Sequence, residues 1–141
     1  MQTIIGKNYP KQVIPLIESA KRSIKIVVYD WRWYENDPGN PCQLFNASIV
    51  RAKKRGVNIK ACVNSEAIAK PLKENGIDVK IPISKNLIHT KFIIIDDKIL
   101  IMGSHNFSQS AFTTNFETSI IQDDPLEINE FILFFHSIYS L

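Results

Sequence analysis

Residues His89–Asn106 read HTKFIIIDDKILIMGSHN, and this stretch decides how the rest of the chain is interpreted. It contains two short apolar runs, Phe92–Ile95 and Ile99–Met102, with three charged residues between them. Runs that are apolar on both faces and rich in β-branched residues are typical of strands buried on both sides of a sheet. The short polar interval between the runs predicts a tight antiparallel hairpin.

The loop of this hairpin sets its register. If Asp97 and Lys98 form a two-residue loop, Asp96 pairs with Ile99. These residues lack the glycine that two-residue turns prefer, so the alternative is a longer loop with a shifted register.

Four polar residues are expected to meet at the open end of the hairpin. Counting back from the two-residue loop places Lys91 opposite Ser104 and His89 opposite Asn106. Because side chains alternate with period two along a strand, all four then share one face of the sheet.

These side chains suit a phosphodiester. The ammonium of Lys91, the amide of Asn106 and the hydroxyl of Ser104 can bind the non-bridging phosphate oxygens, over which charge spreads in the transition state. A neutral imidazole at His89 can attack phosphorus and form a covalent phosphohistidine. Glu117, on an expected strand that runs to Ile121, is a candidate to accept the other ring proton of His89 and fix its tautomer.

The spaced set His89-x-Lys91-x4-Asp96-x6-Gly103-Ser104-x-Asn106 resembles the HKD motif of the phospholipase D superfamily. Asn115-x-Glu117 resembles a further element downstream of that motif, and the order of elements in the N-terminal half matches as well, so the resemblance covers most of the chain. It implies a phospholipase D-like fold and catalysis by these residues. Asp96 is expected to point away from His89 and to support the fold or the site through hydrogen bonds.

Periodicity in the first half predicts a helix, strand, helix, strand, helix, strand order. Apolar residues recur at helical spacing over 10–23 and 42–55, and a short helix is expected within 66–75, interrupted or begun near Pro71. Strands are expected at 24–29, 57–63 and 77–83. A last helix begins after Asp124-Pro125. The chain is predicted to be a single domain, 1–141, of class α/β, with a mixed, mostly parallel β-sheet flanked by helices.

The chain has only one such motif, and the chemistry makes that number informative. In an in-line displacement the nucleophile and the leaving oxygen lie on opposite sides of phosphorus, so one imidazole cannot attack and also protonate the leaving group. A two-fold symmetric homodimer would supply a second His89 across a shared active site. The small single-motif members that the chain resembles are homodimeric endonucleases, which implies the same arrangement.

Composition permits an anionic partner without requiring one. The 141 residues are 45% hydrophobic and 22% charged, with a net charge of +3. No carboxylate cluster with metal-ligand spacing accompanies the motif, so we expect no cofactor and metal-independent catalysis, with Lys91 taking the place of a metal ion. The favoured function is a nuclease of low sequence specificity that cleaves DNA and/or RNA. The alternatives are a phospholipid phosphodiesterase and an inactive relative that binds nucleic acid.

Two further groups of residues are candidates for substrate contact. Trp31, Arg32 and Trp33 lie in the turn-rich segment 30–41, where they could stack on bases or hold phosphates. The alternative is that the tryptophans pack under the loop or at a subunit interface. His105 is expected at the rim of the site, whereas His136 lies within the last helix and is expected to be structural.

The remaining features concern the compartment. Cys42 and Cys62 form no CxxC or Cys/His cluster, which favours two buried or free thiols in a reducing compartment over a zinc site. Residues 1–7 contain no signal-peptide core, and no stretch is long enough to span a bilayer. We therefore expect a cytoplasmic protein without membrane partners, although a removed signal or anchor segment is an alternative.

Overall fold

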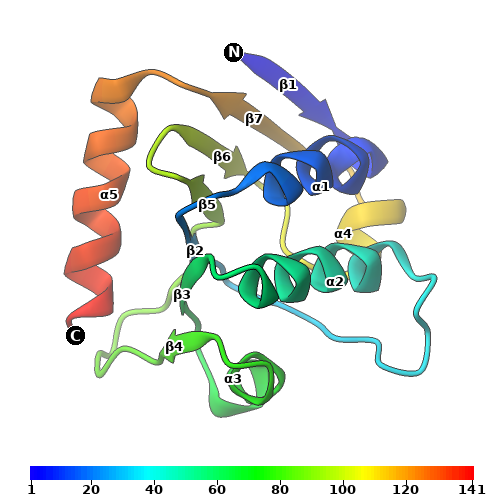
Figure 1. Cartoon of the computed structure of the whole chain (residues 1–141), viewed down its shortest axis with the longest axis horizontal. Coiled ribbons are helices and arrows are strands. Elements are labelled where there is room, and N and C mark those ends of the chain that lie inside the picture. Colours follow the sequence, from blue (N-terminus) through cyan, green and yellow to red (C-terminus); the bar gives the residue numbers. More distant parts are fainter.

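A seven-stranded sheet organises the chain, and the computed structural model describes all residues from 1 to 141 (Figure 1). The strands are β1 (Gln2–Ile5), β2 (Ser23–Val27), β3 (Asn58–Cys62), β4 (Asp78–Lys80), β5 (Phe92–Ile95), β6 (Ile99–Gly103) and β7 (Thr118–Gln122). The helices are α1 (Tyr9–Ser19), α2 (Pro41–Lys54), α3 (Glu66–Glu74), α4 (Gln109–Thr113) and α5 (Pro125–Tyr139), with a short 3₁₀ helix η1 (Gly6–Asn8) before α1.

The strand order is β1-β7-β6-β5-β2-β3-β4, and it divides the sheet into two parts. β2, β3 and β4 are parallel, with α2 and α3 as the crossovers that the first half of the sequence predicted. The remaining pairs, β1 with β7, β7 with β6, β6 with β5 and β5 with β2, are antiparallel. The prediction of a mixed α/β sheet is confirmed, but the prediction that it is mostly parallel was wrong. Only β5 and β6 form a hairpin with a short turn, whereas the other antiparallel pairs join strands that longer parts of the chain separate.

The β5–β6 hairpin differs from the predicted register by one residue. Ile95 pairs with Ile99, so the turn contains three residues instead of two. Lys98 N–H donates to the carbonyl of Ile95 at 3.0 Å, and Asp96 and Asp97 both have positive φ, 53° and 54°, as the two central residues of a type I′ turn require. Aspartate tolerates this left-handed conformation better than most residues. The pairing of Asp96 with Ile99 was therefore wrong.

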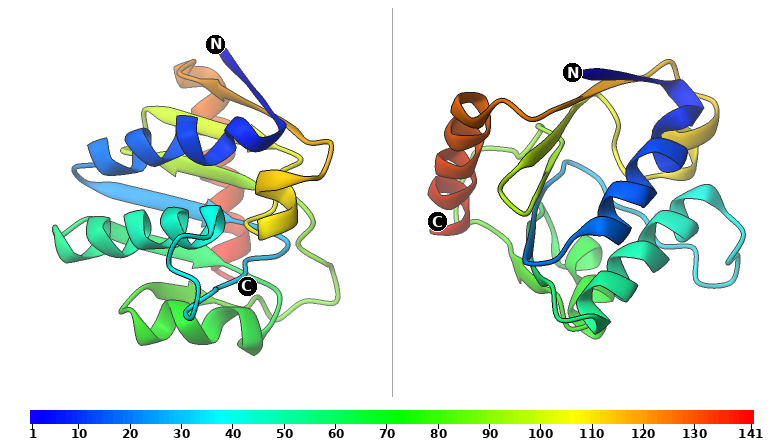
Figure 2. Two further views of the ribbon diagram at one scale, coloured as in Figure 1. Left: turned by 90° about the vertical axis from the view of Figure 1, so that its right-hand side faces the viewer. Right: turned by 45° about the horizontal axis from the view of Figure 1, so that its top comes forward.

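Helices cover both faces of the sheet, as the views in Figures 1 and 2 show. α1, α2, α3 and α4 pack on one face, where they enclose the larger apolar cluster of 27 buried residues. α5 lies alone on the opposite face, over a smaller cluster that includes Phe92, Ile94 and Leu100. None of the helices combines the length and the apolar composition that crossing a membrane requires.

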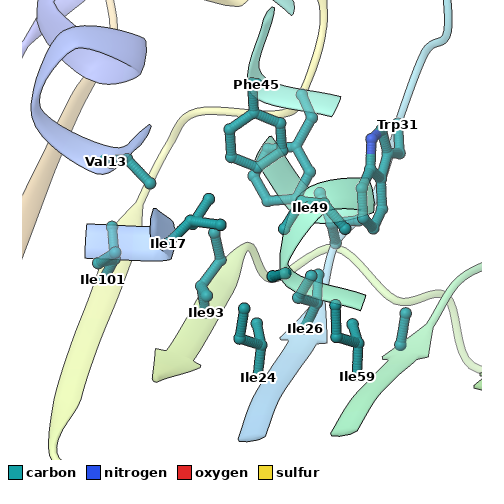
Figure 3. Close-up of a cluster of buried hydrophobic side chains, with 14 of the residues drawn as sticks. Val13, Ile17, Ile24, Ile26, Trp31, Phe45, Ile49, Ile59, Ile93 and Ile101 are labelled. Atoms are coloured by element: carbon teal, nitrogen blue, oxygen red, sulfur yellow. The ribbon is translucent and has the colours of Figure 1, made fainter. Parts of the chain in front are cut away.

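The larger apolar cluster takes up every second side chain of the central strands. Ile24 and Ile26 of β2, with Ile93 of β5, point toward α1 and α2, where Ile17 and Ile49 meet them (Figure 3). Their intervening neighbours face α5 instead, since successive side chains of a strand point to opposite faces. Burial of each such side chain contributes about 1.5–3 kcal/mol to folding.

Cys42 and Cys62 are free and buried within these clusters, as predicted. Burial raises the pKa of each thiol to about 12, so both remain protonated. Neither thiol is therefore poised as a nucleophile.

Candidate active site

The site forms at the open end of the β5–β6 hairpin, where the sequence predicted it. Residues 89–91 lead into β5, and residues 104–106 follow β6. Gly103 N–H donates to the carbonyl of Lys91 at 3.4 Å, so Lys91 lies opposite Gly103. The predicted pairings of Lys91 with Ser104 and of His89 with Asn106 were wrong by one residue, but the four residues do gather at one end of the hairpin.

Tyr29, two residues beyond the end of β2, lies between the two motif residues that precede β5. Its ring centroid is 5.1 Å from that of His89, and the Nζ atom of Lys91 is 5.7 Å from the same ring. The second distance is within the range of a cation–π interaction. The imidazole and the ammonium thus lie against the same tyrosine ring. His89 itself is exposed and makes no hydrogen bond, so both ring nitrogens are free.

Asn64 holds the segment that carries His89. Its Nδ2 donates to the carbonyls of Ile88, at 2.8 Å, and Tyr29, at 3.1 Å, and its Oδ1 accepts from Ile88 N–H at 3.0 Å. One side chain therefore ties the residue before His89 to the end of β2. The carboxyl ends of parallel strands are where α/β sheets place their ligands, and both Asn64 and Tyr29 follow such ends. That rule is the signal that could have identified these two residues from the sequence.

Asn106 is oriented by its neighbour across the sheet. Its Oδ1 accepts from the backbone N–H of Asp30 at 3.1 Å. Because the carbonyl oxygen of the amide is used in this way, the NH₂ group is left as a donor.

Ser104 and Glu117 form a second, connected group. Ser104 Oγ donates to Glu117 Oε1 at 2.6 Å and accepts from Thr118 N–H at 3.0 Å. Asn115 Nδ2 donates to Glu117 Oε2 at 3.0 Å. Both carboxylate oxygens of Glu117 are therefore hydrogen-bonded to residues other than His89, and the structure does not join Glu117 to His89 as the sequence interpretation expected.

Asp96 lies at the turn end of the hairpin, far along the strand from the site. Its carboxylate accepts from the backbone N–H groups of Lys21, Arg22 and Ser23 at 2.7–3.2 Å. Partial burial alone would raise the pKa of Asp96, but these three donors outweigh it and hold the pKa below its ordinary value. Of the two roles expected for Asp96, support of the fold or of the site, the hydrogen bonds indicate support of the fold. Asp96 is not among the residues that meet at the site.

Two of the candidate substrate contacts are instead buried. Trp31 is 2% exposed and donates from Nε1 to Asn46 Oδ1 at 2.7 Å, and Figure 3 shows it beside Ile49 in the core. His105 is 1% exposed, with Nδ1 2.7 Å from Ser119 Oγ and Nε2 2.8 Å from the carbonyl of Gly6. The predictions that Trp31 and His105 touch substrate were wrong, because an apolar core and a complete set of buried hydrogen bonds take up both side chains.

The other two residues of the segment lie nearer the surface. Trp33 is half-buried and stacks on Trp31, with centroids 6.4 Å apart. Arg32 is exposed, and its Nε pairs with Asp30 Oδ2 at 2.8 Å. Asp30, Arg32 and Tyr34, together with polar residues of α4, line a polar pocket of about 460 Å³. This pocket adjoins Asn106, because Asp30 contacts both.

A second, more apolar groove of about 430 Å³ borders the site at His89. His89 and Thr90 form one edge, and Leu87, Phe134 and Leu141 contribute apolar surface. The groove therefore runs between the loop before β5 and the C-terminal end of α5. No three His, Cys, Asp or Glu side chains lie together in a way that could hold a metal ion.

Comparison with known proteins identifies the family of the chain. A family model described as "Cardiolipin synthase, PLD-like domain" matches residues 13–139. The chain is 30% identical to a phospholipase D of Rickettsia prowazekii over 120 residues, which cover 81% of the chain and 54% of that protein. It is 27% identical over 114 residues to the 5′-3′ exonuclease PLD3 of Xenopus tropicalis, covering 70% of the chain and 23% of that protein.

The fold also has a close match among solved structures. Nuc from Salmonella typhimurium, a phospholipase D family member, superposes with a TM-score of 0.80 at 23% identity, over 98% of this chain and 93% of that one. The chain spans about half the length of the Rickettsia phospholipase D that it matches.

Proposed function

The chain belongs to the phospholipase D-like family, and from this premise we propose that it hydrolyses phosphodiester bonds through His89. The observation that carries the proposal is the exposure of His89 and its freedom from hydrogen bonds. His89 is exposed, has no hydrogen-bond partner, and lies against the same tyrosine ring as Lys91. An unengaged imidazole near a cation is suited to attack an anionic phosphorus centre.

The proposed reaction has two displacements. A neutral ring nitrogen of His89 attacks phosphorus, a P–N bond forms, and the bond to the leaving oxygen breaks as an acid protonates that oxygen. Lys91 and the free NH₂ of Asn106 hold the non-bridging oxygens. Water, deprotonated by the group that served as acid, then attacks phosphorus and releases His89.

A second copy of the chain supplies the acid in this scheme. The other two histidines offer no substitute, since His105 is buried with both nitrogens engaged and His136 lies on α5 without lining the groove beside His89. A homodimer with both His89 residues facing one phosphate provides the second imidazole, with the axis passing beside the exposed His89. The apolar groove next to His89 is then close to the partner.

Nucleic acid is the substrate that we favour. The net charge of +3 and the polar pocket beside Asn106 suit a polyanion with polar groups on both sides of the scissile phosphate. A relative of 27% identity is a 5′-3′ exonuclease. We propose cleavage of DNA or RNA with low sequence specificity and without a metal ion, with Lys91 supplying the positive charge.

A phospholipid is the second candidate, and the groove beside His89 favours it. Leu87, Phe134 and Leu141 give that groove an apolar lining next to the proposed nucleophile, where an acyl chain could lie. A relative of 30% identity is a phospholipase D.

The test is cleavage of labelled single- and double-stranded DNA and RNA in excess EDTA, by the native chain and by His89→Ala. His136→Ala is the matched control, because it removes an exposed imidazole that does not line the groove. Cutting that survives EDTA, vanishes in His89→Ala and persists in His136→Ala supports the proposal.

The same preparation should then be offered phospholipid vesicles. Release of head groups without any cutting of nucleic acid would replace the nuclease with the lipid candidate, and inertness toward all substrates would indicate a relative that only binds. Sedimentation measures the dimer separately, and full activity in a species that stays monomeric would contradict the shared site.

A further inference from the structure

Phe116 is the most exposed large apolar side chain of the protein, at 105% of its reference area. It lies between Asn115 and Glu117, in the segment that joins α4 to β7. Full exposure of an aromatic ring leaves its apolar surface in water, which is unfavourable unless something else covers it.

The backbone around Phe116 is held on both sides, so the ring projects from a fixed base. Asn115 N–H donates to the carbonyl of Ser110 at 2.9 Å, and the carbonyl of Glu117 accepts from Gly6 N–H at 2.8 Å. The side chains of Asn115 and Glu117 are also hydrogen-bonded to each other, at 3.0 Å. These contacts link the flanks of Phe116 to Ser104, through the 2.6 Å bond from its hydroxyl to Glu117.

The neighbours of Phe116 along the chain are polar. Thr113, Thr114 and Asn115 precede it, and Glu117 and Thr118 follow it. Of the other exposed apolar residues, Leu87 and Phe134 line the groove beside His89, and Ile5 lies opposite Thr118 on the neighbouring strand β1. One aromatic ring with one isoleucine across the sheet, among hydroxyl, amide and carboxylate groups, is a poor match for a lipid surface or for an apolar protein interface. It suits a flat, polar-edged aromatic ligand.

We propose that Phe116 stacks on a nucleobase of the nucleotide next to the scissile phosphodiester. The inference rests on the proposed nuclease function and extends it to the form of the substrate. Stacking on one face of a base requires that base to be unstacked from its own strand, so the substrate is single-stranded at the site. Every base has a π face, so this contact holds a strand without selecting its sequence.

Three variants separate stacking from mere apolarity. Phe116→Trp enlarges the aromatic face, Phe116→Leu keeps an apolar side chain without a π face, and Phe116→Ala removes both. Each is made in a His89→Ala background so that binding is measured without cleavage. Leu126→Ala is the matched control, since Leu126 is 81% exposed at the start of α5.

Binding is measured by fluorescence anisotropy with a single-stranded DNA oligonucleotide and with an abasic strand of equal length. Loss of a base–aromatic stack weakens affinity roughly 5- to 100-fold, so Phe116→Ala and Phe116→Leu should both bind the normal strand at least about 5-fold more weakly. Phe116→Trp should bind as well as the parent or better. The abasic strand should bind the parent weakly and should respond much less to the substitutions.

Equal affinity of Phe116→Leu and the parent would overturn the inference in favour of a simple apolar contact. Equal affinity of all variants would show that Phe116 does not contact the strand. Failure of the proposed function is a different result: the native chain would then cut none of the four nucleic acids in EDTA, whatever the binding data show.

Discussion

The Oγ atom of Ser104 donates a 2.6 Å hydrogen bond to Oε1 of Glu117 and thereby joins the end of β6 to the start of β7. β6 and β7 approach closely here because Gly103 has no side chain. A Cβ at that position would collide with the backbone of Thr118 and Ser119. This bond makes Ser104 a candidate support for Glu117 within one chain, as an alternative to the direct phosphate contact that the sequence suggested.

A double-mutant cycle distinguishes these two roles of Ser104. If Ser104 acts through Glu117, Ser104→Ala lowers kcat for phosphodiester hydrolysis, and the Ser104→Ala/Glu117→Gln double variant loses no more than Glu117→Gln alone. The measurement is kcat for each of the four proteins. Multiplicative losses in the double variant would instead indicate that Ser104 contacts the phosphate by itself.

Asn106→Asp tests the amide donor without disturbing the fold. The aspartate keeps an oxygen that accepts from Asp30 N–H, so the structure around it is retained. The NH₂ donor is replaced by an anionic oxygen that repels phosphate, and kcat should fall roughly 100- to 1,000-fold. Thermal unfolding serves as the control and should change little. Activity within a few-fold of native would rule out a phosphate contact by Asn106.

Asn64→Ala tests whether the site depends on the support beneath His89. Without this side chain, the two hydrogen bonds to Ile88 and the one to Tyr29 are lost, and the imidazole is less well placed. Small displacements of a reacting group cost roughly 10- to 100-fold in rate, so kcat should fall while KM changes little. Asn64→Asp should not restore the rate, because a carboxylate oxygen would face the carbonyls of Ile88 and Tyr29 that now accept from Nδ2. A kcat of Asn64→Ala equal to that of the native chain would contradict a positioning role.

Asp96→Asn should destabilise the protein without altering the chemistry. A neutral amide accepts more weakly from the N–H groups of residues 21–23, and hydrogen bonds to charged groups contribute about 1.5–3 kcal/mol. We expect a loss of about 2 kcal/mol in the free energy of unfolding by urea. At temperatures where both proteins are folded, kcat should be unchanged, and a large fall in kcat would place Asp96 in the active site after all.

The lowered pKa of Asp96 also makes the free energy of unfolding depend on pH. Its contribution to stability is fully present above the ordinary carboxyl pKa of 3.8 and is lost as pH falls through the lower pKa of the folded state. The difference in unfolding free energy between native and Asp96→Asn should therefore shrink below about pH 4. A difference that stays constant down to strongly acidic pH would contradict this.

Protonation linked to His105 should lower the free energy of unfolding at a higher pH than protonation of Asp96 does. Burial lowers the pKa of His105 below its ordinary value of 6.5, although the hydrogen bond to Gly6 and the charge of Glu117 act in the opposite direction. The unfolded chain then binds a proton before the folded one does, so unfolding free energy decreases as pH falls below about 6.5. His105→Gln, which can still donate to the carbonyl of Gly6, should flatten that slope between pH 7 and 5. An unchanged slope would assign it to other groups.

The sequence by itself determined the class of fold and the polar residues that gather at the candidate site. Spacing from His89 to Asn106 identified the motif, because side chains that one hairpin brings together must keep a fixed interval along the chain. Periodicity located the helices and the parallel strands, since the burial of one face imposes it. The open end of the hairpin was likewise predicted to gather His89, Lys91, Ser104 and Asn106.

Only the tertiary structure decided which side chains are free to act. Trp31 and His105 have the chemistry of substrate-binding residues, but packing against α2 and hydrogen bonds to Gly6 and Ser119 bury them. Tyr29 and Asn64 support the site from other strands, through contacts between residues 24 to 60 positions apart. Such contacts depend on strand order, and a one-residue change in the turn at Asp96 was enough to shift the register. Local sequence specifies which groups are present, whereas burial and long-range pairing determine which of them reach the substrate.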